Sequence, residues 1–117
     1  MQVTRLRDAR LYKAPGHFEV SALRLQGMEA SDAGFAWVGL SHFLPGGGCE
    51  MDASPLAKIY VVIAGKIEIQ LANGETETLS ALDSCYIPGG EARSIRNPSN
   101  MPASMIVVMP PPPGDGS

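Results

Sequence analysis

Short apolar runs separated by turn residues make up most of the chain. Polar and apolar residues alternate strictly from Lys66 to Leu71, which is the two-residue period of a strand with one buried face. The preceding run, Lys58–Ala64, is nearly continuous in β-branched residues, which is typical of a strand buried on both faces. Asn73-Gly74 predicts a tight hairpin turn after these strands.

The same reasoning along the whole chain predicts β-strands joined by turns and no helix. The predicted strands are Phe18–Leu25, Phe35–Leu44, Lys58–Ala64, Lys66–Leu71, Glu75–Leu79, Ser84–Ile87, Glu91–Arg96 and Met101–Met109. The predicted turns and loops are Gly27–Gly34, Pro45–Gly48, Pro88–Gly90 and Asn97–Asn100. Such a pattern indicates an antiparallel sandwich or barrel. We expect one domain over residues 1–109 and a flexible Pro/Gly-rich tail over residues 110–117.

Composition narrows the function classes. The net charge of −3 argues against nucleic-acid binding, because phosphate backbones require a basic face. No apolar run is long enough to span a membrane, and the first residues lack the apolar stretch of a secretory signal, so a cytoplasmic location is expected. Cys49 and Cys85 match no zinc or redox motif and are expected to be packed, reduced thiols; the alternative is that Cys85 is a reactive thiol lining a pocket.

Two segments resemble the paired motifs of the cupin superfamily. In the first, Gly46 is followed after five residues by Asp52-Ala53-Ser54, then after three by Lys58 and after six by Gly65. In the second, Pro88-Gly89-Gly90 is followed after two residues by Arg93 and after three more by Asn97. The resemblance implies an all-β fold, the antiparallel cupin-type double-stranded β-helix, or jelly-roll barrel.

The resemblance also defines where a cupin would hold its metal. Cupin metal sites use three imidazoles and one carboxylate, a donor set that suits iron, manganese, nickel or zinc. This chain has Asp52, Ser54, Lys58 and Arg93 at those four positions. Lysine and arginine only donate hydrogen bonds, and two cations repel a divalent ion. We therefore predict no metal ligand and no cofactor.

The same four positions are candidates for binding an anion in the barrel mouth. One negative charge on Asp52 against two positive charges, on Lys58 and Arg93, leaves an excess of +1. Arg93 can clamp a carboxylate through two hydrogen bonds, and Lys58 can hold its other end or act as a base. Tyr60 lies in register with Lys58 and deeper on the same wall, while His42 is a candidate acid or base.

An alternative role for these residues is purely structural. Asp52 could form an ion pair with Lys58 or Arg93 and fill the space of a lost metal. Trp37 and Phe43 share a strand face and are predicted to be core residues rather than a substrate platform.

The preferred hypothesis is a cupin-fold protein that binds a small anionic, carboxylate-type metabolite. The alternative is a metal-independent enzyme that performs acid–base chemistry, such as an isomerase, cyclase or decarboxylase. A metal-dependent dioxygenase ranks last, because it would need ligands from His42, Cys49, Glu50 and Asp52. Small cupins resemble one another in forming homodimers, so a homodimer is expected, with Val3–Tyr12 as a candidate for strand exchange.

Overall fold

The computed structural model describes residues 1–113, and nine antiparallel strands form most of it. The last four residues of the predicted tail, 114–117, lie outside the described residues. The strands are β1 (Arg10–Leu11), β2 (His17–Gln26), β3 (Trp37–Asp52), β4 (Lys58–Ala64), β5 (Ile67–Leu71), β6 (Thr76–Leu79), β7 (Ser84–Ile87), β8 (Arg93–Arg96) and β9 (Ala103–Met109). A single 3₁₀ turn, η1 (Leu6–Asp8), is the only helical element in residues 1–113, and no helix there is long and apolar enough to cross a membrane.

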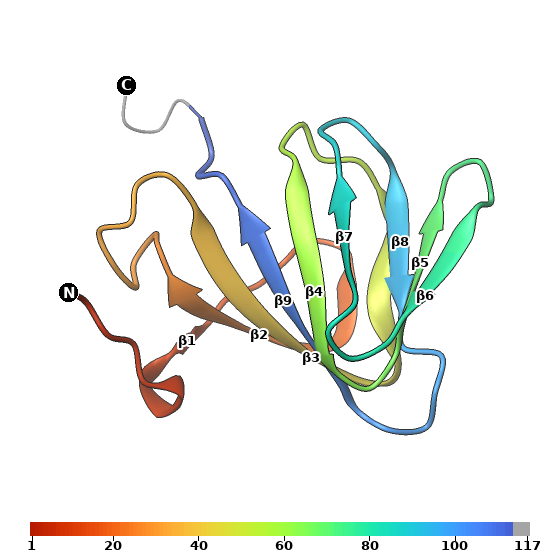
Figure 1. The fold of residues 1–117 in the computed structure, drawn as a ribbon, viewed down its shortest axis with the longest axis horizontal. Helices are drawn as coiled ribbons and strands as arrows, with labels where there is room; N and C mark the ends of the chain where they lie inside the picture. The colour runs from red at the N-terminus through yellow and green to blue at the C-terminus, as the bar shows by residue number, and fades with distance from the viewer. Residues whose placement is uncertain (114–117) are drawn as a thin grey trace.

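The strand order confirms the predicted cupin-type barrel. The hydrogen-bonded path runs β6-β5-β8-β3-β9-β4-β7, and β2 adds to β3 with β1 beside it. The first part of β3 pairs with β2 and β9, and its last part pairs with β8. Figure 1 shows β3 running from the side of β2 and β9 to the side of β8. β3 therefore pairs with strands on both sides of the barrel, with β2 and β9 at its start and with β8 at its end, and connects these two walls.

The predicted turn at Pro45–Gly48 is wrong, because β3 continues through it. The strand bends there, and only glycine fits the close approach of its neighbours. A Cβ on Gly47 would lie 2.4 Å from the carbonyl oxygen of Glu19, and one on Gly48 would lie 1.9 Å from that of Ile95. These glycines let β3 pass close to both β2 and β8. The glycine-rich segment therefore lies where one strand continues from one wall of the barrel to the other, and it is not a turn.

Asn97 fixes the loop that follows β8. Its buried side-chain amide donates to the carbonyl oxygens of Phe43 and Met101, at 3.2 and 2.7 Å. Its Oδ1 atom accepts a hydrogen bond from the Ser99 N–H at 3.0 Å. The predicted turn at Asn97–Asn100 is confirmed. The asparagine of the second motif thus ties this turn to β3.

The core fills the space between the two walls. It consists of buried side chains that alternate along the strands. Its members are Phe43, Cys49, Tyr60, Val62, Ile67, Ile69, Leu79, Ile87, Ile95, Ala103, Met105 and Val107. The N-terminal strand β1 pairs with β2 of its own chain, at Arg10 opposite Arg24.

Candidate functional site

A cavity of about 370 Å³ opens into the barrel beside this core. Its volume is within the usual range for sites that bind small molecules. Strands β2, β3, β4, β8 and β9 contribute to its walls, together with the segment that precedes β2. Its lining includes the polar and aromatic residues Tyr12, His17, Arg24, Trp37, Asp52, Ser54, Lys58, Tyr60 and Arg93. Five of the six predicted site residues are therefore brought together.

Strand β4 supplies Lys58 and Tyr60. Alternate residues of this strand point inward, and Lys58 and Tyr60 are only 3% and 2% exposed. Burial lowers the pKa of Lys58, and the positive charge of Arg93 lowers it further. The Lys58 ammonium makes no hydrogen bond within residues 1–113, although its side chain lines the cavity.

Arg93 is the first residue of β8, opposite Asp52 of β3. It is 8% exposed. Its Nε atom donates to the Tyr60 hydroxyl at 2.9 Å, and a terminal nitrogen donates to the Asp52 carbonyl oxygen at 3.3 Å. Burial raises the pKa of Tyr60 to about 12, even though Arg93 lowers it in part. Tyr60 therefore stays a neutral hydroxyl, which orients the guanidinium without neutralising it.

The carboxylate of Asp52 does not form the ion pair that was considered as an alternative. Its Oδ1 atom accepts the N–H of Ala53 at 2.9 Å, and no cation of residues 1–113 lies within 4.0 Å of the carboxylate. In residues 1–113 the only ion pair at that distance joins Arg7 and Asp8 on the surface. The Ser54 hydroxyl accepts the N–H of Leu56 at 3.1 Å. Two buried cations thus line the cavity without a carboxylate partner among the described residues.

His42 is a correction to the predicted site, because it does not line the cavity. Ser41 and Phe43 do, and neighbouring residues of a strand point to opposite faces. The His42 ring is instead 2.8 Å from the Ser104 hydroxyl on the neighbouring strand, β9. The sequence contains a signal for this placement, because Phe43 is predicted to be buried and its neighbour His42 must then point to the opposite face of the strand.

His17 is a site residue that sequence reasoning missed. It begins β2, pairs with Cys49 of β3 and lines the cavity. Its Nδ1 atom lies 3.0 Å from the Pro15 carbonyl oxygen. Burial lowers the pKa of His17, and the charge of Arg93 also lowers it. Its position depends on pairing between distant segments, and no local motif marks it.

A second missed group surrounds Arg24 of β2. Its guanidinium lies 4.2 Å from the ring centroid of Tyr12 and 4.6 Å from that of Trp37. These three side chains also line the cavity. Phe43 is buried in the core and Trp37 packs against it, as predicted, and both also border the cavity. Aromatic and apolar surfaces therefore accompany the cations.

The residues of the cavity do not fit the metal that cupins commonly hold. Within residues 1–113, no three His, Cys, Asp or Glu side chains are grouped so that they could bind a metal ion. The four motif positions supply two cations, one hydroxyl and one carboxylate, and the cations would repel a divalent ion.

Neither cysteine lines this cavity. Both are free; Cys49 is buried in the core, and Cys85 lines a separate cavity of about 160 Å³. Burial raises the pKa of each thiol, which disfavours the reactive thiolate. The interpretation of both residues as packed thiols fits this placement.

Comparison with known proteins agrees with the architecture. The cupin domain family matches residues 39–109. β-D-galactosidase Rv1717 of Mycobacterium tuberculosis is 40% identical over 109 residues, which is 93% of each chain. The polyketide cyclase RemF of Streptomyces resistomycificus has a TM-score of 0.83 at 20% identity, over 96% of this chain and 82% of that one. A predicted oxalate decarboxylase of Thermotoga maritima has a TM-score of 0.74 at 21% identity, over 93% and 97%. The chain belongs to the cupin domain family.

Proposed function

We propose that the barrel cavity binds a small anionic, carboxylate-type metabolite, with Lys58 and Arg93 as its counter-ions. The observation that supports this function is that both cations are buried and neither has a carboxylate within 4.0 Å among the described residues. Burying a charge without a partner is unfavourable, so such groups are found where a ligand supplies the opposite charge.

The electrostatic gain is large enough to support binding. At an effective dielectric constant of about 20, an anion about 4 Å from one cation gains about 4 kcal/mol before desolvation is subtracted. Arg93 keeps its second terminal nitrogen available, because its recorded hydrogen bonds use Nε and one terminal nitrogen. Tyr60 fixes the plane of the guanidinium in advance, which reduces the entropy lost on binding.

The rest of the cavity would bind the carbon skeleton of the ligand. Trp37, Met105 and Val107 present apolar surface along the wall. Asp52 and Ser54 also line the cavity and are less buried than Lys58, and a hydroxyl-bearing ligand would find an acceptor there. A small acid with a ring or a short chain fits this combination of charge and apolar surface.

Calorimetric titration with carboxylic and sugar acids tests the proposal, beginning with benzoate, hexanoate and galactonate. We expect binding that Arg93→Met weakens by about tenfold or more, because a hydrogen bond to a charged group contributes about 1.5–3 kcal/mol. Arg96→Met is the matched control, since Arg96 is an exposed cation on the same strand. Absence of binding by every acid, or equal binding by the Arg93→Met variant, would contradict the proposal.

A second candidate function is hydrolysis of a β-galactoside. It is favoured by the relative that is 40% identical over nearly the whole chain and is named a β-D-galactosidase. Glycoside hydrolases usually place two carboxylates at the scissile bond. Asp52 is the only carboxylate among the described residues that line this cavity. The acid would therefore be a different group, and Lys58, whose pKa is lowered by burial, is the candidate.

Release of nitrophenol from 4-nitrophenyl β-D-galactoside tests this second function. We expect Asp52→Asn to reduce turnover by about 10²-fold or more, the usual contribution of a positioned acid or base. Turnover that survives in this variant would show that Asp52 is not the reacting carboxylate. No turnover by the wild-type protein would remove this function and leave anion binding to its own test.

A further inference from the structure

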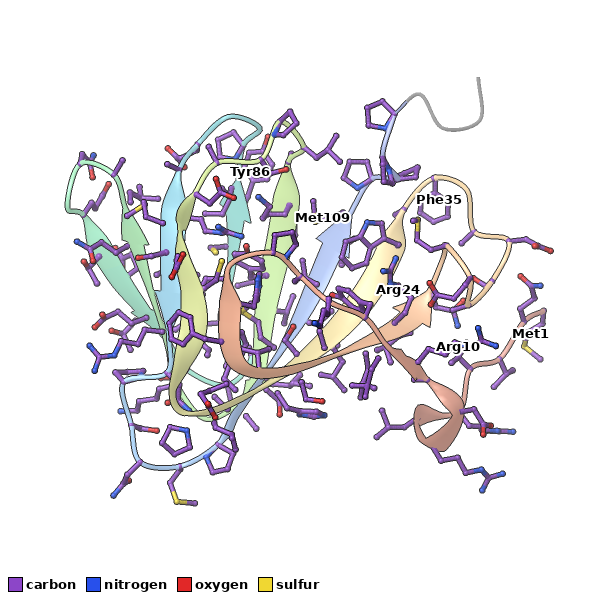
Figure 2. All side chains as sticks on the ribbon, turned by 180° about the vertical axis from the view of Figure 1, so that it is seen from behind. Met1, Arg10, Arg24, Phe35, Tyr86 and Met109 are labelled. Carbon is purple, nitrogen blue, oxygen red and sulfur yellow. The ribbon has the colours of Figure 1, made fainter. Side chains whose placement is uncertain are left out.

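The side chain of Arg24 lines the barrel cavity and also a second cavity of about 210 Å³. Its guanidinium contacts two aromatic rings, Tyr12 and Trp37, which lie edge to face with centroids 5.6 Å apart. Contact with two rings fixes the plane of a guanidinium and leaves its edge available for hydrogen bonding. Figure 2 labels Arg24 of β2 and Met109 of β9, and both residues line the cavity.

This guanidinium has no acceptor in residues 1–113. None of its nitrogens makes a hydrogen bond there, no carboxylate lies within 4.0 Å, and its Nε atom is buried without a partner. Arg93, in contrast, is bonded to the Tyr60 hydroxyl and to the Asp52 carbonyl oxygen. Buried polar groups usually have a hydrogen-bond partner, so the buried Nε atom of Arg24 marks this guanidinium as a candidate to bind an acidic group of a ligand.

Arg24 lies on the same row of the sheet as Tyr60. Arg24 is opposite Gly39, Gly39 is opposite Val107, and Val107 is opposite Tyr60. Three strand spacings therefore separate Arg24 from Tyr60, or about 14 Å between their Cα atoms along the sheet. The two guanidinium groups of Arg24 and Arg93 border one cavity from separate positions on its wall.

Gly39 leaves the space that the aromatic pair occupies. A Cβ at this position would lie 2.6 Å from the Tyr12 hydroxyl oxygen, 3.0 Å from Trp37 and 3.1 Å from Val107. Any other residue would push the rings away from the sheet. The absence of a side chain here allows Tyr12 and Trp37 to hold Arg24.

We propose that Arg24 is a second anion-binding residue of this cavity and that the ligand is a small diacid. One carboxylate would lie against Lys58 and Arg93, and the other would accept two hydrogen bonds from the edge of Arg24. This inference rests on the proposed function, because it adds a second acidic group to the same ligand. It makes Arg24 the residue that distinguishes diacids from monoacids.

Matched pairs of acids test this inference by calorimetric titration. The pairs are adipate and hexanoate, terephthalate and benzoate, and galactarate and galactonate, each a diacid and a monoacid of the same skeleton. We expect at least one diacid to bind wild-type protein about tenfold or more tightly than its monoacid, as a charge-assisted hydrogen-bond pair implies. Arg24→Met should weaken binding of the diacid about tenfold or more beyond any change in binding of its monoacid, so that the preference is lost. Arg93→Met should weaken both members of each pair.

The outcomes separate the two proposals. Monoacids and diacids that bind equally, with no effect of Arg24→Met, would overturn the role of Arg24 and leave the proposed function intact. Failure of every acid to bind would overturn the proposed function and this inference with it. If Arg24→Met does not fold, Arg24→Lys keeps the charge and loses the planar fork, and it should retain only part of the diacid preference. An unchanged preference in Arg24→Lys would count against the inference.

Discussion

Replacing Lys58 by methionine should stabilise the ligand-free protein. Lys58 is 3% exposed, makes no hydrogen bond in residues 1–113 and has a pKa that burial lowers. Methionine has a similar length and an unbranched, adaptable side chain that fills the same space without a charge. The substitution removes the cost of keeping an unpaired cation inside the barrel.

The expected gain follows from this environment. Replacing buried charges by apolar groups of similar volume is often stabilising by about 1–4 kcal/mol, and the cavity beside Lys58 places the gain at the low end, about 1–2 kcal/mol. For a domain of this size, each kcal/mol raises Tm by about 3–6 °C. Anion binding should be lost in the same variant, because its counter-ion is gone.

Urea denaturation in a buffer free of carboxylates and phosphate measures the gain, with Lys66→Met as the matched control. Lys66 is an exposed lysine in the turn after β4, so its replacement should change the free energy of unfolding by less than about 0.5 kcal/mol. Adding a binding acid at 100 times its Kd should stabilise the wild-type protein by about 2.7 kcal/mol and leave Lys58→Met unchanged.

A loss of stability would refute this reasoning. If Lys58→Met lowers the free energy of unfolding by 1 kcal/mol or more, Lys58 has a stabilising partner inside the barrel. The cation would then be structural, and the main support for an anion site would disappear.

The remaining predictions concern pH, the Arg93 contact and association. Because the pKa of Lys58 is lowered in the folded state, the folded protein binds fewer protons than the unfolded protein between that pKa and 10.5. The stability of the wild-type protein should therefore rise relative to that of Lys58→Met as pH increases through this window. A difference in urea denaturation that stays constant with pH would contradict this. Tyr60→Phe removes the acceptor of Arg93 Nε and should cost about 1.5–3 kcal/mol in thermal or urea unfolding, and an unchanged midpoint would show that the contact contributes nothing. Sedimentation should show a homodimer that dissociates when residues 1–12, which contain the candidate exchange segment and β1, are removed, and a monomeric wild-type protein would exclude this exchange.

Much of the fold could be predicted because it depends on local requirements. The spacing from Gly46 to Gly65 and from Pro88 to Asn97 resembles cupin motifs, and these residues hold bends and turns of the barrel. Strand alternation placed Lys58 and Tyr60 on one inner wall. The glycines after Pro45 resemble a turn in the sequence but lie within β3, because close packing of neighbouring strands and a tight turn both require glycine.

The site could be predicted only in the part that the motifs cover. His17 and Arg24 line the cavity because β2 pairs with a distant segment of β3, and no short motif marks that pairing. His42 is excluded from the cavity by strand alternation, because its neighbours Ser41 and Phe43 occupy the inner face. Residues contributed by long-range pairing are where a single sequence is least informative.

A crystal structure of the protein grown with a binding carboxylic acid tests the central claim most directly. The account predicts density for a carboxylate between the Lys58 ammonium and the Arg93 guanidinium, with Asp52 still turned toward its own backbone. A carboxylate of Asp52 paired with Lys58 or Arg93, and no acid in the cavity, would contradict it.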